Sequence, residues 1–360
     1  MWKRSQNPEH GTSTMGVRAT MQTITEHSGA DPAGAITALE SGEPFIVRGI
    51  AAHWPVVAAA RSGDHAVLAY LRSTMARQDI AFAEAAPQHR GRFHYNADLT
   101  GFTFTRRRLP SMAFLDELAG EITAATPRTI AAQGIVAQAA APLFEQANPL
   151  PICPGQGEAR LWIGNRARVA AHSDPAENLA YCAAGRRRFT LFAPEQVGNL
   201  YLGPFEPTPA GTPIAMTDPL EPDLKRYPRF ATAMDAALVA DLEPGDALYI
   251  PYGWFHHVEA LSAVSVLFNY WWNASSPALG SAWDVLLHAF TALRPLAPTA
   301  RRHWAAMLLH YGLERDGPAG AHLPCAARGV LDAREQRDLA TMRAILLRNL
   351  SRQDMPPDRQ

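Results

Sequence analysis

The chain reads Val-Ala-Ala-His-Ser-Asp at residues 169–174, and this stretch decides the fold. Its first three residues are small or β-branched, which suits a strand that faces a packed interior. A strand points residues i and i+2 to the same face, so the His172 imidazole and the Asp174 carboxylate can meet at one point. Far downstream, residues 251–257 read Pro-Tyr-Gly-Trp-Phe-His-His and follow a turn at Gly245-Asp246, so a second strand can bring another imidazole there.

Two imidazoles and one carboxylate make the donor set that holds Fe(II) on one face and leaves three coordination positions open. We therefore predict that His172, Asp174 and one downstream histidine bind a metal ion. Neighbouring strand residues face opposite ways, so only one of His256 and His257 can bind, and alternation does not say which. The segment His257-Val258-Glu259 has the same spacing but ranks second, because it would leave the upstream pair without a role. In the competing structural interpretation, His172 is a core histidine and Asp174 a turn residue.

Short apolar segments separated by Gly, Pro and Asn surround this motif and predict strands. They cover residues 160–163, 168–172, 187–192, 247–250 and 264–271. Many short strands of this kind predict a jelly-roll, so we expect a mainly β core with flanking helices over residues 158–275. Residues 194–229 are proline-rich and weakly periodic, and they are interpreted as an insertion over the mouth of the barrel.

The rest of the chain divides into three further parts. Residues 1–30 are polar and without apolar periodicity, which predicts a mobile tail. Residues 31–157 predict a mixed α/β scaffold, with a strand inside 43–49 and helices that begin at Asp64 as a cap and after Ser111. Residues 276–360 carry apolar residues at three-four spacing over 282–293, 299–311 and 331–350, which predicts a helical unit. Such apolar helices must pack on the barrel or on a second copy of the chain.

The composition is that of an ordinary globular protein: the net charge of the 360 residues is −1, so nucleic acid is an unlikely main partner. Arginine runs at 106–108 and 186–188 are local and form no long basic stripe. An odd number of widely spaced cysteines argues against a disulfide framework and favours a reducing cytoplasm: Cys153, Cys182 and Cys325. No apolar run reaches membrane-spanning length and the N-terminus lacks a signal-peptide core, so we expect a cytoplasmic protein without a membrane partner.

An iron site with three open positions usually takes a 2-oxo acid, whose far carboxylate needs a cation and polar donors. In residues 186–192, strand alternation places Arg187 on the apolar face with Phe189. A buried arginine has to pair with an anion, either this carboxylate or a structural Asp or Glu. Asn178 and Asn269 have the parity to hydrogen-bond the cosubstrate, or else to satisfy backbone groups of the barrel.

Together these segments resemble the cupin-like JmjC-domain Fe(II)/2-oxoglutarate oxygenases over about residues 40–275. The resemblance is carried by Arg160-Leu-Trp-Ile-Gly164, His172-Ser-Asp174, Asn178, Gly185 to Phe192, Gly245 to Pro251, Trp254 to Glu259 and Asn269-Tyr-Trp-Trp. It implies a double-stranded β-helix, with His172, Asp174 and His256 as the catalytic metal ligands, so it selects His256 over His257. It further implies that Asn178 and Asn269 lie near the iron or the cosubstrate, and that the C-terminal helices form a homodimer.

The chain departs from the family pattern at the cosubstrate site. The family's cosubstrate-binding lysine falls on Arg187, which keeps the cation in a chain whose only lysines are Lys3 and Lys225. The partner threonine falls on Val169, and a tyrosine expected near residues 130–133 is missing. The far carboxylate of 2-oxoglutarate would therefore have fewer hydroxyl donors.

The sequence thus predicts an Fe(II)- and 2-oxoglutarate-dependent dioxygenase that consumes O2. His-x-Asp members of the family are mostly hydroxylases, so we expect hydroxylation of a protein side chain or another unidentified substrate rather than demethylation. One alternative is a non-oxidative metal-binding cupin, either an isomerase or a small-molecule binding module. The other is a catalytically inactive regulatory dimer in which the helices carry the function.

Overall fold

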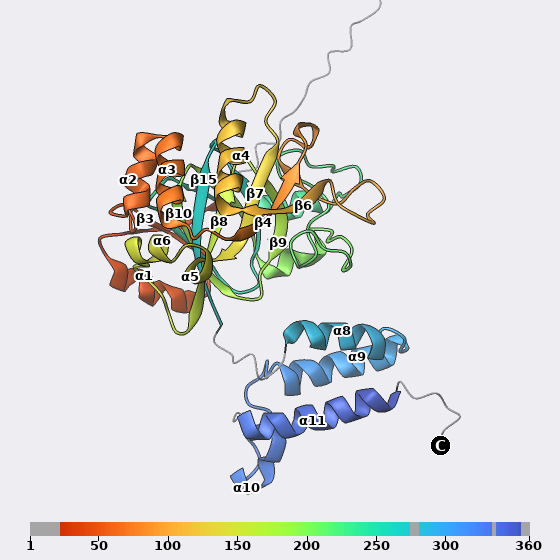
Figure 1. Cartoon of the computed structure of the whole chain (residues 1–360). Coiled ribbons are helices and arrows are strands. Elements are labelled where there is room, and N and C mark those ends of the chain that lie inside the picture. Colours follow the sequence, from red (N-terminus) through yellow and green to blue (C-terminus); the bar gives the residue numbers. More distant parts are fainter. Residues whose placement is uncertain (1–21, 274–280, 333–335, 354–360) are drawn as a thin grey trace, which may run out of the picture. The chain divides into compact units, whose positions relative to one another are not determined.

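The computed structural model describes residues 22–273, 281–332 and 336–353. The chain divides into two compact units, residues 1–273 and residues 274–360. The first unit is built mainly from strands and the second from helices (Figure 1). The tail predicted for residues 1–30 is wrong from residue 22 onward, because short strands already lie at Gln22–Thr23 and Thr25–Ser28. Residues 1–21 lie outside the described residues.

Two sheets form the first unit, and the smaller one carries the motif His172-Ser173-Asp174. Its six strands follow the order β1-β12-β11-β14-β9-β5. Their bounds are β1 Gln22–Thr23, β12 Leu238–Leu242, β11 Arg187–Phe192, β14 Phe255–Ala260, β9 Arg168–Ser173 and β5 Arg92–Phe93. The strands β9, β14, β11 and β12 pair antiparallel, so segments from both ends of the core lie side by side.

The larger sheet has nine strands in the order β2-β3-β13-β10-β15-β8-β7-β4-β6. Their bounds are β2 Thr25–Ser28, β3 Phe45–Arg48, β13 Ala247–Ile250, β10 Glu177–Ala184, β15 Ser265–Trp272, β8 Gly157–Gly164, β7 Thr129–Val136, β4 Asp79–Ala85 and β6 Phe104–Pro110. The two sheets with their flanking helices make the predicted jelly-roll, and all five segments predicted as core strands are strands in the structure.

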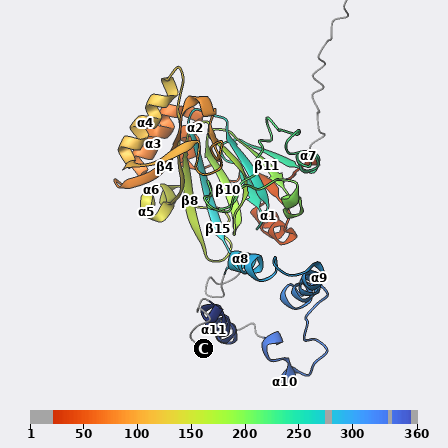
Figure 2. The same ribbon diagram turned by 90° about the vertical axis from the view of Figure 1, so that its right-hand side faces the viewer.

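Helices cover the outer face of the larger sheet, where α2 contacts β10 and α5 contacts β7 and β8. In Figure 2, α2 to α6 lie on one side of the larger sheet, and β11 of the smaller sheet lies on its other side together with α7. The helices are α1 Pro32–Ala38, α2 Pro55–Ser62, α3 Asp64–Thr74, α4 Ser111–Thr123, α5 Ala137–Ala140, α6 Pro142–Ala147 and α7 Phe230–Asp235. Single 3-10 turns lie at Leu39–Ser41, Pro87–His89 and Pro194–Gly198.

The core has two main layers. The first packs the covering helices on the larger sheet and includes Trp54, Leu115 and Phe268, all of them buried. The second lies between the sheets and includes Phe189 and Leu248. Burying a large apolar side chain contributes roughly 1.5–3 kcal/mol, so these layers hold the facing strands at a fixed distance.

Two local expectations need correction. Asp64 does not cap α3, because Gly63 is the N-cap residue and Asp64 is the first residue of the helix, where its charge still suits the helix dipole. The second helix, α4, begins at Ser111 itself rather than after it, and it buries Phe114, Leu115 and Leu118.

The C-terminal unit consists of helices joined by turns. Their bounds are α8 Ala282–Ala292, α9 Pro298–Met307, a π-helical turn Leu308–Gly312, α10 Cys325–Arg328, a 3-10 turn Gly329–Asp332 and α11 Gln336–Gln353. No residue of α8 or α9 is buried within the described chain. Across the described residues, no helix combines the length and the apolar character that a membrane span requires.

Candidate metal centre and cosubstrate cavity

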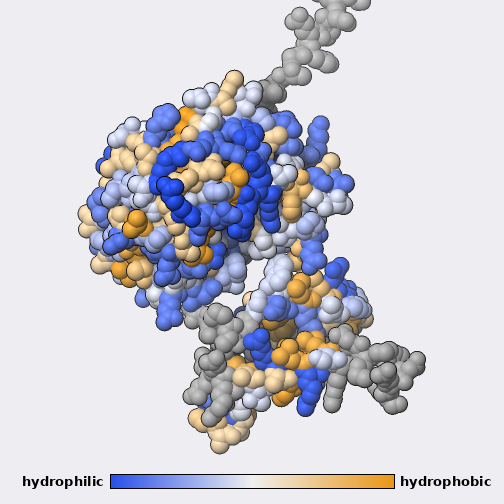
Figure 3. Space-filling model, viewed as in Figure 1, coloured by the Kyte–Doolittle hydropathy of each residue, from blue (hydrophilic) through white to orange (hydrophobic). Residues whose placement is uncertain are grey.

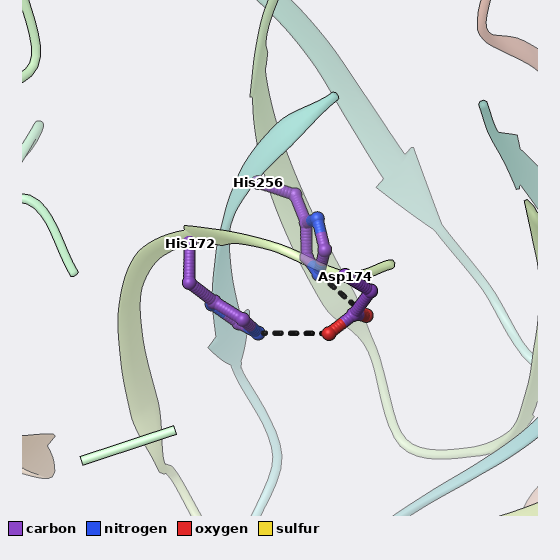
Figure 4. Close-up of side chains that lie close together, drawn as sticks. All are labelled: His172, Asp174 and His256. Carbon is purple, nitrogen blue, oxygen red and sulfur yellow. Dashed lines mark ion pairs between the residues drawn. The ribbon is translucent and has the colours of Figure 1, made fainter. Parts of the chain in front are cut away.

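Strands β9 and β14 bring the two predicted imidazoles together. The strands pair antiparallel, and the register places His256 directly opposite His172, so both side chains leave the sheet on the same face. Their ring centroids lie 4.4 Å apart. Asp174 follows the last residue of β9 and turns its carboxylate toward both rings, as Figure 4 shows.

The ligand atoms of these three residues lie within 4.8 Å of one another, close enough for one ion to touch all three. The Asp174 carboxylate places Oδ1 3.9 Å from His172 Nε2 and Oδ2 3.5 Å from His256 Nε2. His256 is 4% exposed and His172 9%, so both rings are almost fully removed from bulk water.

The backbone orients both rings. His172 Nδ1 lies 2.9 Å from the carbonyl oxygen of Ala170, and His256 Nδ1 lies 3.2 Å from that of Trp254. An Nδ1–H donated to a carbonyl leaves Nε2 without a proton and free to bind a metal ion. Burial, and next the charge of His172, lower the pKa of His256 to about 4, so this ring is neutral near pH 7.

His257 takes the opposite face of β14. Its Nε2 lies 3.8 Å from Asp218 Oδ1, away from the cluster of His172, Asp174 and His256. Of the two neighbouring histidines, His256 is the one that the structure brings beside His172 and Asp174. The alternative metal-binding pair, His257 and Glu259, lacks a third ligand. Neither residue belongs to a cluster of three metal-ligating side chains among the described residues.

A cavity of about 310 Å³ opens beside the three residues. Both sheets contribute to its wall, which contains every residue proposed from the sequence for the metal or the cosubstrate. The lining residues are Gln133, Gly134, Arg160, Trp162, Val169, His172, Asp174, Asn178, Arg187, Phe189, Ala210, His256, Val258, Leu267, Asn269 and Trp271. This volume is within the range of small-molecule sites, so the metal centre has room for a chelating cosubstrate.

Arg187 is the buried cation of this cavity, with 7% of its surface exposed. No described carboxylate lies within ion-pair distance of it, and its buried Nε has no hydrogen-bond partner. Burial lowers the pKa of Arg187 to about 10, which leaves it charged at pH 7. The structural salt bridge considered from the sequence is therefore absent from the described residues, and the cation is free to bind an anion in the cavity.

Asn178 and Asn269 face each other from β10 and β15, and Asn269 Nδ2 donates to Asn178 Oδ1 at 2.8 Å. The buried Asn269 Oδ1 has no partner. Val169 lines the cavity at the position where the resemblance implies a threonine, and Gln133 lies in the stretch where it implies a tyrosine. None of the described side chains that line the cavity carries a hydroxyl.

The donor set fits an iron ion and a 2-oxo acid. Two imidazole nitrogens and one carboxylate are the ligands of the facial site for Fe(II). The unpaired Arg187 Nε and Asn269 Oδ1 are polar atoms buried without partners, which costs free energy unless a ligand satisfies them. Both atoms belong to residues that line the cavity.

Sequence reasoning missed Arg160, Trp162 and Trp271 as cavity residues. They lie on the neighbouring strands β8 and β15, where the register pairs Asn269 with Arg160. Alternation along each strand gives Arg160 the parity of Trp162, and Trp271 the parity of Asn269. With Asn269 facing inward and this register, strand alternation places all three side chains at the cavity.

Comparison with known proteins adds a family and several relatives. A family model described as a cupin-like domain matches residues 37–278. The chain is 37% identical to human HSPB1-associated protein 1 over 124 residues, which cover 33% of this chain and 24% of that protein. It is 30% identical to lysine-specific demethylase JMJ31 of Arabidopsis thaliana over 116 residues, or 32% of this chain and 21% of the demethylase.

A longer match joins the chain to the human bifunctional peptidase and (3S)-lysyl hydroxylase JMJD7. It is 29% identical over 262 residues, which cover 64% of this chain and 77% of the relative. The chain spans only about a quarter of the length of the HSPB1-associated proteins it matches. The family model, by contrast, covers most of the chain and includes every strand of both sheets except β1 and β2. The chain therefore belongs to the cupin-like, JmjC-type family of oxygenases.

Proposed function

We propose that this protein is an Fe(II)- and 2-oxoglutarate-dependent hydroxylase. One observation carries the proposal: His172, Asp174 and His256 meet at the wall of a cavity that also holds the unpaired cation Arg187. A metal site that served structure alone would be closed by a fourth ligand and would need no buried arginine beside it. An open face beside a free cation suits a bound acid and a reacting gas.

The side chains divide the work. His172, Asp174 and His256 would hold Fe(II) on one face and turn its remaining positions toward the cavity. When bound, the iron and 2-oxoglutarate supply the oxidising chemistry, in which O2 is consumed and the 2-oxo acid becomes succinate and CO2. Arg187 would hold the far carboxylate and so fix the angle at which the acid approaches the metal. The apolar walls at Val258 and Leu267 exclude water.

The test is turnover by the purified full chain after anaerobic loading with Fe(II). We expect 2-oxoglutarate to be converted slowly to succinate even without a prime substrate, with matching O2 uptake, and Asp174→Ala to abolish both. Iron-loaded protein that binds the metal but never consumes 2-oxoglutarate would favour a non-oxidative cupin. Full cellular activity of Asp174→Ala would instead favour a regulatory dimer without catalysis.

The substrate that we propose is a protein side chain or a small molecule, and the reaction is hydroxylation. One relative is named a lysyl hydroxylase and another a lysine-specific demethylase, so both outcomes occur among similar chains. The carboxylate of this site is Asp174. By the resemblance, family members with a His-x-Asp motif are mostly hydroxylases, and this supports hydroxylation. Mass spectrometry separates the two outcomes, because hydroxylation adds one oxygen and demethylation removes a methyl group.

We also propose that the protein is a cytoplasmic homodimer formed through the C-terminal unit. This unit exposes large apolar side chains in α8, α9 and α11, and Figure 3 shows hydrophobic residues at its surface. They include Val285, Leu286, Leu287, Trp304, Ile345, Leu346 and Leu347. A second copy would cover this surface, as exposed patches of this kind mark interfaces. Light scattering should give twice the chain mass, and Leu346→Glu should give a monomer; a wild-type monomer would exclude the dimer.

A further inference from the structure

The cavity at the metal centre adjoins a second hollow that shares Gln133 and Ala210 with it. This second hollow has a volume of about 320 Å³ and is bounded by β4 residues 81–83, by Arg106 of β6 and by the insertion at Pro209 and Ala210. Arg106 donates a hydrogen bond of 3.2 Å to the Pro209 carbonyl and so fastens the insertion at this place. The shared residues place the second hollow directly beside the cavity that holds the metal ligands, and we call the two adjoining hollows together the path.

Apart from Asp174, the charges along this path are positive. Apart from the two histidines of the metal cluster, the charged side chains that line either hollow among the described residues are Arg106, Arg160, Arg187 and Asp174. Asp174 belongs to the proposed metal site, where the metal ion would neutralise its negative charge. Arg187 is assigned to the cosubstrate, which leaves two arginines for whatever else enters.

Arg160 lines the cavity, and one of its donors has no partner. Its Nη1 donates to the Gly134 carbonyl at 3.1 Å and its Nη2 pairs with Glu158, but its buried Nε has no partner. The Glu158 side chain is 47% exposed and does not line the cavity, so it neutralises Arg160 only in part. The guanidinium lies over the Trp271 ring at 5.2 Å, and the buried Trp271 Nε1 also lacks a partner.

The arginine run at 106–108 continues this pattern at the second hollow. Arg107 points to the helix side of β6 and pairs with Glu84 and Glu117. Arg106 lies opposite Ala83 in the sheet register and has no ion pair among the described residues. The small side chain of Ala83 leaves the space in which a ligand can reach Arg106.

We propose that this path binds a prime substrate that carries a carboxylate, on an acidic peptide side chain or on a small acid, with Arg160 Nε and Trp271 Nε1 as its donors. The proposal rests on the function proposed above and names the substrate class of the same site. Two buried donors without partners need an acceptor, and an anion between arginines gains charge-assisted hydrogen bonds. Two relatives are named for lysine. Apart from Asp174, however, a lysine side chain in this path would face only positively charged side chains among the described residues.

The test measures binding to the iron-loaded full chain under anaerobic conditions with saturating 2-oxoglutarate, which occupies Arg187. The probes are acetyl-Ala-Ala-Glu-Ala-Ala-amide, the same peptide with Lys in place of Glu, and N-acetylglutamate amide as a small acid. We expect the Glu peptide to bind at least about ten-fold more tightly than the Lys peptide. The small acid distinguishes the sources: affinity equal to that of the Glu peptide assigns the site to a free acid, and weaker binding assigns it to a peptide.

Variants locate the effect. Arg160→Gln should remove the preference for the Glu peptide, Arg160→Lys should keep part of it, and Trp271→Phe should weaken binding roughly five-fold while the ring is retained. The exposed Arg166 lines neither hollow, so Arg166→Gln is the matched control and should change nothing. Thermal melting verifies that each variant folds, and Trp271→Phe carries the test if Arg160→Gln does not.

Three results would overturn the proposal: no binding of either acid, equal binding of the Lys peptide, or unchanged selectivity in Arg160→Gln and Trp271→Phe. Tighter binding of a short oligothymidylate than of the Glu peptide would also overturn it in favour of a nucleic acid. The function itself is judged separately by succinate formation in the wild type. Selective acid binding without succinate would reject the hydroxylase and keep the subsite.

Discussion

His256 and His257 are neighbours on β14, yet they face surroundings that differ above all in space. His256 opens on the cavity of about 310 Å³, whereas the hollow beside His257 measures about 10 Å³. The smaller volume is close to the least that holds one water molecule. Both rings are almost fully buried, so burial alone does not separate a metal-binding histidine from a structural one.

The charges on the two faces are also arranged differently. Behind β14, Asp218 lies 3.3 Å from Arg92 Nε and 3.8 Å from His257 Nε2, so the charges of the protein meet one another. On the cavity face, Arg187 has no such partner among the described residues. The buried charge of Arg187 has a cavity beside it, where a ligand can bind. The buried charge of Asp218 has no such space, and it links the insertion to the sheet through Arg92 and His257.

Loss of a proposed metal ligand should reduce activity more than any other substitution. His256→Ala should lose stoichiometric Fe(II) and lower 2-oxoglutarate turnover by more than about 100-fold, since losses even one layer outside a metal site cost 10–100-fold. His257→Gln should keep the iron, because this ring faces Asp218. Iron content by mass spectrometry and succinate formation measure both. Equal iron loss in the two variants would reject the assignment of faces.

Arg187→Met tests the cavity face without touching the metal ligands. It should raise the KM for 2-oxoglutarate between about 10- and 100-fold, the range expected for lost hydrogen bonds to a charged group. Without cosubstrate the variant should melt at a higher temperature than the wild type, because an unpaired buried charge is removed. Arg187→Lys is the matched control and should recover much of the KM. A lower melting temperature with an unchanged KM would make Arg187 structural.

Asp218→Asn is the corresponding change behind β14. In contrast to Arg187→Met, it should lower the stability and leave the KM for 2-oxoglutarate unchanged. It leaves Arg92 and His257 without their carboxylate, so the free energy of unfolding should fall by about 3 kcal/mol. The KM for 2-oxoglutarate should not change, since Asp218 does not line the cavity. Urea denaturation and steady-state kinetics measure the two quantities. A raised KM at unchanged stability would contradict the division.

Acid should destabilise the metal-free protein through the same strand. The folded pKa of His256 is lowered to about 4 from an ordinary value of 6.5, and burial lowers that of His257 in the same direction. The unfolded chain therefore binds more protons, so stability is complete above pH 6.5 and is lost as the pH falls toward 4. At pH 5 the loss from His256 should be about 2 kcal/mol. Urea unfolding at pH 7.5 and pH 5 measures it, and His256→Gln should reduce the difference by the share of His256 and leave that of His257.

A hydroxyl group added to the cavity wall should change activity only mildly. Val169→Thr restores a hydroxyl where the lining has none, so the KM for 2-oxoglutarate should fall by a few-fold, as one added hydrogen bond allows. Val258→Thr is the control, because Val258 faces Val169 across the strands and also lines the cavity. An equal decrease in KM in both variants would mean that general polarity matters rather than the position of the hydroxyl.

Local pattern in the sequence was enough for much of this fold. The i, i+2 spacing of His172 and Asp174 survives at the end of β9, and alternation placed Arg187 inside. Alternation failed for β10, Glu177–Ala184, because a central strand covered on both faces has no polar side to show a period.

Contacts between distant segments could not be predicted from the residues alone. The choice between His256 and His257 depends on the register of β14 against β9, which is irregular between His256 and Val258. A shift of one residue would exchange the two faces. The Arg160 and Trp271 donors likewise depend on β8 meeting β15, and strand composition does not state which strands become neighbours.

Each proposed imidazole ligand is aimed by a main-chain oxygen two residues before it, and the aim is therefore independent of any neighbouring side chain. Substitutions along the cavity wall can accumulate while the geometry at the ion stays the same, whereas an insertion or deletion in either strand would misdirect a ring. Single substitutions at the cavity wall can therefore change which substrate binds, while the proposed metal ligands keep their geometry.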